Sequence, residues 1–164
     1  MANQSILIVD DEPLVLKATA RTLRLAGHHV HTATGLVEAM AICEEHSLDV
    51  LIVDFMMPSV HGLELLARIR KVQPNVKSIV VSGKIDRSTD ESQLTQQLRE
   101  QVEADQYLHK PVAGKKILDA IDDLFSEPTQ SDWQKMAAGM VTPARTSIGK
   151  AKKAATSLPK KRGK

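Results

Sequence analysis

Five short segments with the pattern of strands alternate with stretches of helical periodicity along most of this chain. The strand segments lie at 5–9, 29–33, 49–53, 77–81 and 106–109, and helices are predicted at 13–27, 36–46, 62–72, 86–103 and 113–125. Regular alternation of strands and helices is typical of parallel sheets with helices on both faces. The sequence therefore predicts an α/β fold, a doubly wound, five-stranded parallel sheet with five helices.

The third strand segment indicates where a functional site lies. Val50 to Val53 are all apolar, which is typical of a strand buried on both faces, and Asp54 follows them directly. Burying a carboxylate is costly unless another group pairs with it. Because parallel strands bring their carboxyl ends to one edge of the sheet, we expect partners for Asp54 among the residues that follow the other strands.

Three other predicted strands also end in polar residues. These residues are Asp10 and Asp11 after the first strand, Ser82 after the fourth and Lys110 after the fifth. Carboxylates that crowd together repel one another, and a bound Mg²⁺ would relieve that repulsion. A carboxylate nucleophile, a metal and a cation are together what phosphoryl transfer requires.

Each of these residues taken alone has a simpler interpretation. Asp10 or Asp11 could cap the following helix, Lys110 could be a solvated lysine, and Ser82 could belong to an ordinary turn. Tyr107, three residues before the lysine, could be a half-buried strand residue. Their joint occurrence, in this order, favours the functional interpretation.

In these residues the chain resembles the receiver domains of two-component response regulators. The resemblance covers about residues 5–125 and includes Met57-Pro58, Gly62 and Lys110-Pro111. It implies a flavodoxin-like sheet with strand order 2-1-3-4-5. It also implies a signalling protein whose own phosphorylation and dephosphorylation are its only catalysis. One departure is His61, where the family usually has Asp or Asn.

The resemblance further implies a role for each matching residue. Asp54 would accept a phosphoryl group from a phosphohistidine on a histidine kinase or phosphotransfer protein. Mg²⁺ would be bound by Asp11, Asp54 and the backbone carbonyl of Met56, with Asp10 acting through a water. Lys110 and Ser82 would bind the phosphoryl group, Tyr107 would turn inward, and the bond before Pro111 would be cis. An unidentified downstream protein would read the altered surface.

The remaining composition bears on the compartment and on other chemistry. The single cysteine, Cys43, fits a reducing compartment, and we expect a cytoplasmic protein with no membrane span. His28, His29 and His31 suggest a metal site, but no acid or cysteine joins them at ligand spacing. A turn followed by an exposed strand is therefore the favoured interpretation of the three histidines.

The charge changes sign near residue 126. Residues 1–125 hold 13 basic and 18 acidic residues, whereas 126–164 hold 9 and 2. We expect a receiver domain at 4–126 and a linker at 127–142 with a short amphipathic helix, which could fold back or dock a partner. The last segment, 143–164, is predicted to be a flexible basic tail, either solvated or binding nucleic acid or another polyanion.

A haloacid-dehalogenase-like phosphatase is the alternative from another class, because such enzymes also use Asp, Mg²⁺, Ser or Thr, and Lys. They carry Asp-x-Asp at the nucleophile, whereas Asp54-Phe55-Met56 lacks the second aspartate. Their acid pair also comes late in the chain, and here it comes first. Both differences disfavour a phosphatase.

Overall fold

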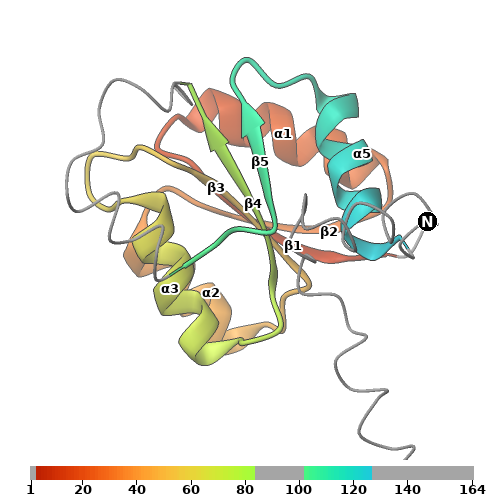
Figure 1. Ribbon diagram of the computed structural model, residues 1–164. Coiled ribbons are helices and arrows are strands. Elements are labelled where there is room, and N and C mark those ends of the chain that lie inside the picture. The colour runs from red at the N-terminus through yellow and green to blue at the C-terminus, as the bar shows by residue number, and fades with distance from the viewer. Residues whose placement is uncertain (1–2, 84–101, 127–164) are drawn as a thin grey trace, which may run out of the picture. The chain divides into compact units, whose positions relative to one another are not determined.

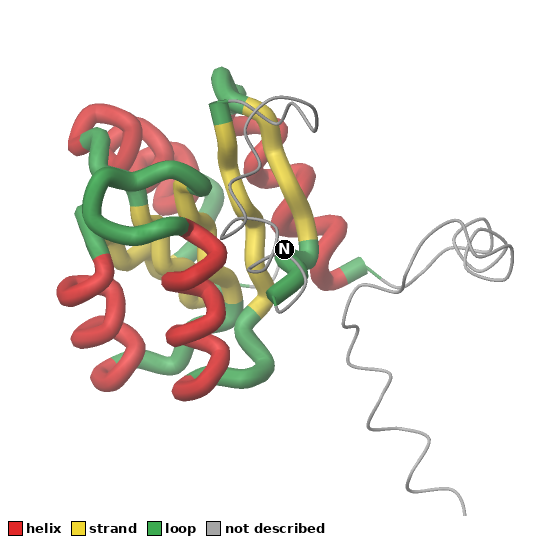
Figure 2. The backbone as a smooth tube through the Cα atoms, turned by 60° about the vertical axis from the view of Figure 1, so that its left-hand side comes forward, coloured by secondary structure: helices red, strands yellow, loops and turns green. Residues whose placement is uncertain are grey.

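The computed structural model describes residues 3–83 and 102–126, and these form one sheet with helices on both sides (Figures 1 and 2). The strands are β1 (Ser5–Val9), β2 (His29–Ala33), β3 (Val50–Asp54), β4 (Lys77–Ser82) and β5 (Gln106–His109). The helices are α1 (Pro13–Leu25), α2 (Leu36–Glu45), α3 (Gly62–Val72) and α5 (Gly114–Phe125).

The sheet confirms the predicted topology. All neighbouring strands are parallel, and their order is β2-β1-β3-β4-β5. Val9 of β1 is in register with Val53 of β3, and Asp54 is in register with Val81 of β4. Asp54 therefore stands at the carboxyl edge of the central strand.

Alternating residues of the central strands pack into two separate cores. Leu7 and Val9 of β1 point to the face covered by α2 and α3, where Leu63 and Leu66 are fully buried. Ile6 and Ile8 point to the opposite core, which α1 and α5 complete. All five residues of β3 are buried, as the apolar run predicted, so the core holds this strand rigidly from both sides.

The ends of α1 follow from two residues with restricted or special backbone geometry. Pro13 starts the helix, where its missing N–H costs no hydrogen bond. Gly27 adopts a φ of 95° just beyond the helix, a conformation that side chains other than glycine rarely tolerate. The chain can then turn directly into β2.

The predicted element boundaries agree with the structure to within one or two residues. Of the fourth predicted helix, 86–103, the part up to residue 101 lies outside the described residues, and 102–104 are not helical. The amphipathic helix and basic tail predicted beyond residue 126 also lie outside them. No helix in the described part of the chain is long and apolar enough to cross a membrane.

Candidate functional site

The carboxyl edge of the sheet brings together polar residues at the ends of β1, β3, β4 and β5. Asp10 and Asp54 are only 4% and 8% exposed, and Ser82 is 2% exposed. The backbone N–H of Lys110 donates to the carbonyl of Ser82 at 2.8 Å, which fixes the end of β5 beside the end of β4. The expected convergence of these strand ends is therefore present.

Lys110 joins the two buried carboxylates. Its Nζ lies 2.8 Å from Oδ2 of Asp54 and 2.9 Å from Oδ2 of Asp10. Burial disfavours the charged lysine, but the hydrogen bonds and negative charges of Asp54 and Asp10 outweigh that effect and raise the pKa of Lys110 well above its usual range. The lysine therefore stays protonated and places a permanent positive charge at the centre of the site.

The three aspartates form a cluster whose donor atoms suit a hard cation. One carboxylate oxygen from each of Asp10, Asp11 and Asp54 lies within 4.8 Å of the other two, and Asp11 is exposed while its neighbours are buried. Oxygen ligands of this kind suit Mg²⁺, which keeps several of its own waters and needs only a few protein ligands. The cluster is therefore open to solvent on one side, as such an ion requires.

The loop after β3 packs closely against Asp54. The backbone N–H of Met56 donates to Oδ1 of Asp54 at 3.3 Å, and the N–H of Gly62 donates to the carbonyl of Phe55 at 3.0 Å. A Cβ built on Gly62 would collide with the backbone carbonyl oxygen of Asp54. Glycine at this position therefore allows α3 to start directly beside the aspartate.

His61 has a role that the sequence did not reveal. It is the N-cap of α3, and its Nδ1 accepts a hydrogen bond from the backbone N–H of Leu63 at 3.3 Å. Its ring also packs edge-on against Phe55, with the ring centroids 4.3 Å apart. The Asp or Asn that the family usually has at this position is a typical helix N-cap. Histidine can take the same role, because a neutral imidazole nitrogen also accepts a hydrogen bond from a backbone N–H.

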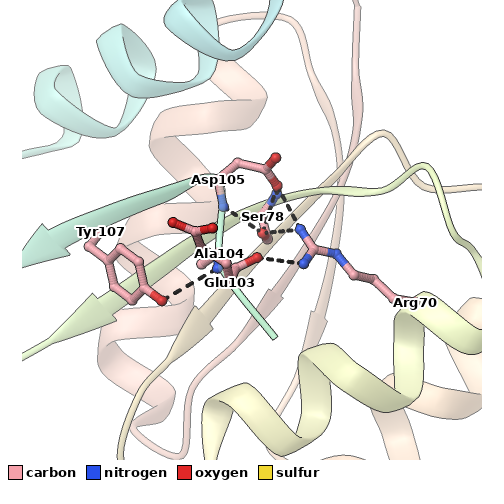
Figure 3. Close-up of polar contacts among 6 residues, drawn as sticks. All are labelled: Arg70, Ser78, Glu103, Ala104, Asp105 and Tyr107. Atoms are coloured by element: carbon pink, nitrogen blue, oxygen red, sulfur yellow. Dashed lines mark hydrogen bonds and ion pairs between the residues drawn. The ribbon is translucent and has the colours of Figure 1, made fainter. Parts of the chain in front are cut away.

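Tyr107 lies at the side of the sheet formed by β5 and is 40% exposed. Its hydroxyl accepts a hydrogen bond from the backbone N–H of Ala104 at 3.4 Å (Figure 3). The side chain is thus held outward in this structure, and the bond links it to the segment that enters β5. The peptide bond between Lys110 and Pro111 is cis, as the resemblance implies.

An ion pair with little solvent exposure holds the segment that enters β5, and no pattern in the sequence indicated it. Arg70 of α3 lies 2.8 Å from Oδ2 of Asp105 and donates to the carbonyl of Glu103 at 2.6 Å. The hydroxyl and backbone N–H of Ser78 both donate to the same carboxylate at 2.8 Å (Figure 3). Because Asp105 has only 3% of its side chain exposed, these donors together hold a buried charge.

Comparison with known proteins identifies the family. The family model of the response regulator receiver domain matches residues 6–122. A CheY-like receiver domain from Methanospirillum hungatei superposes with a TM-score of 0.64 at 30% identity, over 74% of this chain and 93% of that one. Chemotaxis protein CheY4 of Vibrio cholerae gives a TM-score of 0.63 at 26% identity, over 74% and 98%.

Curated relatives are longer proteins. The Escherichia coli transcriptional regulatory protein GlrR is 30% identical over 84% of this chain, and the match spans 30% of GlrR. The Brucella abortus sensor kinase CckA is 40% identical over 48% of this chain and 9% of its own length. The chain therefore matches only a minor part of these two relatives. With residues 6–122 matched, this chain belongs to the family of response regulator receiver domains of two-component signalling.

Proposed function

We propose that this receiver domain accepts a phosphoryl group on Asp54 from a phosphohistidine of a histidine kinase or phosphotransfer protein. The observation that carries the proposal is the position of Asp54, a buried carboxylate 2.8 Å from a lysine Nζ at the edge of a rigid sheet. One Asp54 oxygen forms the new P–O bond while the P–N bond to histidine breaks. The electron pair of that bond stays on the imidazole nitrogen, and the product is an acyl phosphate.

Lys110 supplies the positive charge that this transfer needs. In the resting arrangement it is shared between Asp54 and Asp10, and both partners are within 3 Å. Once Asp54 carries a phosphoryl group, negative charge moves outward onto the phosphoryl oxygens. The flexible lysine side chain then follows the charge, and it stabilises the product without any movement of the strand.

The acidic cluster fits Mg²⁺ by the chemistry of its donor set. Asp11, Asp54 and the backbone carbonyl of Met56 would hold the ion, and Asp10 would act through a water. When bound, the ion would neutralise charge between the aspartates and the incoming phosphoryl oxygens. Asp10 also accepts a hydrogen bond from the backbone N–H of Glu12 at 2.9 Å, which orients its carboxylate towards the cluster.

Phosphorylation would be read out through Ser82 and Tyr107. The Ser82 hydroxyl is a donor at the end of β4, and a phosphoryl oxygen on neighbouring Asp54 would attract it. Displacement of Ser82 would open space beside β5, into which Tyr107 could turn by giving up its bond to Ala104. The resulting change of surface would select a downstream protein, so the domain signals through contacts and turns over no separate substrate.

Phosphorylation by acetyl phosphate tests this function directly. The expected result is an intact-mass increase of one phosphoryl group in the wild type with Mg²⁺. The increase should be absent in Asp54→Asn and after chelation. Asp119→Asn is the matched control, because Asp119 lies on the exposed side of α5 in a surface pair with Lys115. Persistence of the modification in Asp54→Asn would refute the assignment, and sustained turnover of p-nitrophenyl phosphate would favour the phosphatase.

The partner and the tail call for separate measurements. If the phosphoryl group comes from histidine, a phosphorylated histidine kinase should transfer it to the wild type. Asp54→Asn should abolish this transfer. Electrophoretic mobility shifts with the full-length chain and with residues 1–126 test the predicted nucleic-acid role of the basic tail. Binding that does not depend on residues 127–164 would remove that role.

A further inference from the structure

A second cluster of chemically active side chains lies at the opposite edge of the sheet, where β1 and β2 begin. Ser5 and His29 are paired in register there, at the ends of the strands remote from Asp54. A hollow of about 550 Å³ opens at this edge. It is lined by one guanidinium and four imidazoles, those of Arg24, His28, His29, His31 and His46. We call this feature the histidine hollow.

Three different elements bring these side chains together, which the spacing of the histidines alone did not predict. Arg24 lies in the last turn of α1, and its guanidinium donates to the carbonyl of Val30 at 2.8 Å. His46 is the C-cap of α2, and its ring stacks on that of His31 of β2 with a centroid distance of 4.3 Å and an interplanar angle of 27°. The fold therefore brings the two rings together, since they belong to different elements.

His28 contributes a buried hydrogen-bond donor beside the hollow. It is only 6% exposed, and its Nδ1 accepts a hydrogen bond from the backbone N–H of Gln4 at 3.3 Å. This bond requires a neutral ring with its proton on Nε2. Among the described residues, that buried Nε2 has no hydrogen-bond partner, and a buried donor without an acceptor is destabilising.

The electrostatics of the hollow favour a negative ligand. None of the described lining residues carries a carboxylate. Burial lowers the pKa of His31, and the positive charges of His46, His29 and Arg24 lower it further. The carboxylate of Asp49 near the rim already accepts a hydrogen bond from the backbone N–H of Ser5 at 2.8 Å. The C-terminal ends of α1 and α2 favour a cation at this place, and Arg24 supplies the permanent positive charge among the lining side chains.

We propose that the histidine hollow binds a small polyanion of the phosphate type. Phosphate oxygens accept hydrogen bonds from guanidinium and imidazole N–H groups, and the hollow gathers both kinds of donor. Arg24 would provide the fixed charge, and the imidazole N–H groups of His31 and His46 would provide further donors. A metal ion suits the hollow less well, because Arg24 would repel it and the described residues contain no three-ligand cluster other than the aspartates.

The chain offers a clean probe for this site, because all six histidines lie before residue 110 and none is in the basic tail. We would titrate the imidazole signals of the full-length protein by NMR, without Mg²⁺, in millimolar pyrophosphate or in NaCl of equal ionic strength. Pyrophosphate should raise the pKa of His31 by about half a unit or more relative to NaCl. His61 and His109 lie outside the hollow, so they should respond equally to both salts and report any effect of the tail.

Two variants and one control decide the outcome. His46→Gln removes an exposed ring, and Arg24→Gln removes the fixed charge, so each should reduce the response of His31 at least severalfold. Lys71→Gln removes an equal charge from the exposed end of α3 and should leave that response unchanged. Equal shifts in all histidines, an undiminished response in His46→Gln, or displacement of these signals by Zn²⁺ but not by pyrophosphate would each overturn the proposal.

Discussion

Lys110 Nζ and Asp54 Oδ2 are 2.8 Å apart although 56 positions separate the two residues in the chain. The lysine also reaches Asp10, so one ammonium group compensates two carboxylates that are each less than a tenth exposed. This contact links the stability of the domain to the site at which its chemistry is proposed. The same residue can therefore be tested by unfolding and by phosphorylation.

Replacing Lys110 with Met should lower the free energy of unfolding, because Asp10 and Asp54 would then face each other without a cation. Breaking a fully buried pair costs about 3–5 kcal/mol, but the lysine side chain is 23% exposed and water screens the site, so we expect about 1–3 kcal/mol. Urea denaturation without Mg²⁺ measures the change. Lys115→Met, which breaks a surface pair on α5, should cost about 0.5 kcal/mol or less.

The stabilisation by Lys110 should be independent of pH near neutrality. Its folded-state pKa is raised, so its contribution is complete below the ordinary lysine value of 10.5 and is lost only as the pH rises through the higher folded-state value. The difference between wild type and Lys110→Met should therefore stay constant from about pH 6 to 9 and shrink only above about pH 10. A difference that disappears between pH 6 and 9 would contradict a raised lysine pKa.

Gly62→Ala should displace the end of β3, which carries Asp54, and the loop that follows it. The added methyl group would collide with backbone atoms of Asp54 and Phe55, and backbone inside a buried strand cannot move aside cheaply. We expect a loss of about 2 kcal/mol or more together with slower phosphorylation of Asp54.

Gly35→Ala is the matched control for that variant. A Cβ at Gly35 would lie 3.5 Å from Oγ of Ser59, an ordinary contact, and the φ of −176° suits any residue. Its cost should be about 1 kcal/mol or less, from the poorer helix cap alone. Equal losses in the two variants would show that the close approach at Gly62 is not what matters.

The elements and the site could be predicted for different physical reasons. Strands buried on both faces leave continuous apolar runs, and Val50 to Val53 therefore located β3 and its terminal aspartate. The parallel arrangement then placed Asp10, Ser82 and Lys110 at one edge, since chain direction alone decides where such ends meet.

Contacts that depend on side-chain packing between distant segments could not be predicted. Arg70 and Asp105 meet because α3 packs beside the start of β4. In the sequence, neither residue can be distinguished from a charged residue exposed to solvent. His46 joins His31 only because α2 ends where β2 passes, so the histidines appeared as an isolated group. Local patterns do not encode such relationships, because the tertiary fold determines them.

The Arg70–Asp105 pair should contribute far more to stability than a surface pair on the same helix. Arg70→Met would leave the carboxylate of Asp105, which is 3% exposed, with Ser78 as its remaining donor among the contacts described. We expect a loss of about 3 kcal/mol, compared with about 0.5 kcal/mol or less for Arg68→Met, which breaks the exposed pair with Glu64.

A double-mutant cycle separates the pair from the rest of its surroundings. If the two side chains interact directly, Arg70→Met and Asp105→Asn should together cost less than the sum of their separate effects, with a coupling of about 1–3 kcal/mol. Additive losses would show that Arg70 acts mainly through the carbonyl of Glu103, to which it also donates.

The cap at His61 can be separated from its ring contact by three substitutions. Asn retains an acceptor for the backbone N–H of Leu63 but loses the ring, Phe retains a ring against Phe55 but loses the acceptor, and Ala loses both. His61→Asn should therefore be about 1 kcal/mol more stable than His61→Ala, which is the usual value of a helix cap. The free energy of unfolding of His61→Phe should exceed that of His61→Ala by about 0.5–1.5 kcal/mol if the edge-on ring contact stabilises the loop. Thermal unfolding measures both differences, and equal stabilities of the Asn and Ala variants would show that His61 does not cap α3.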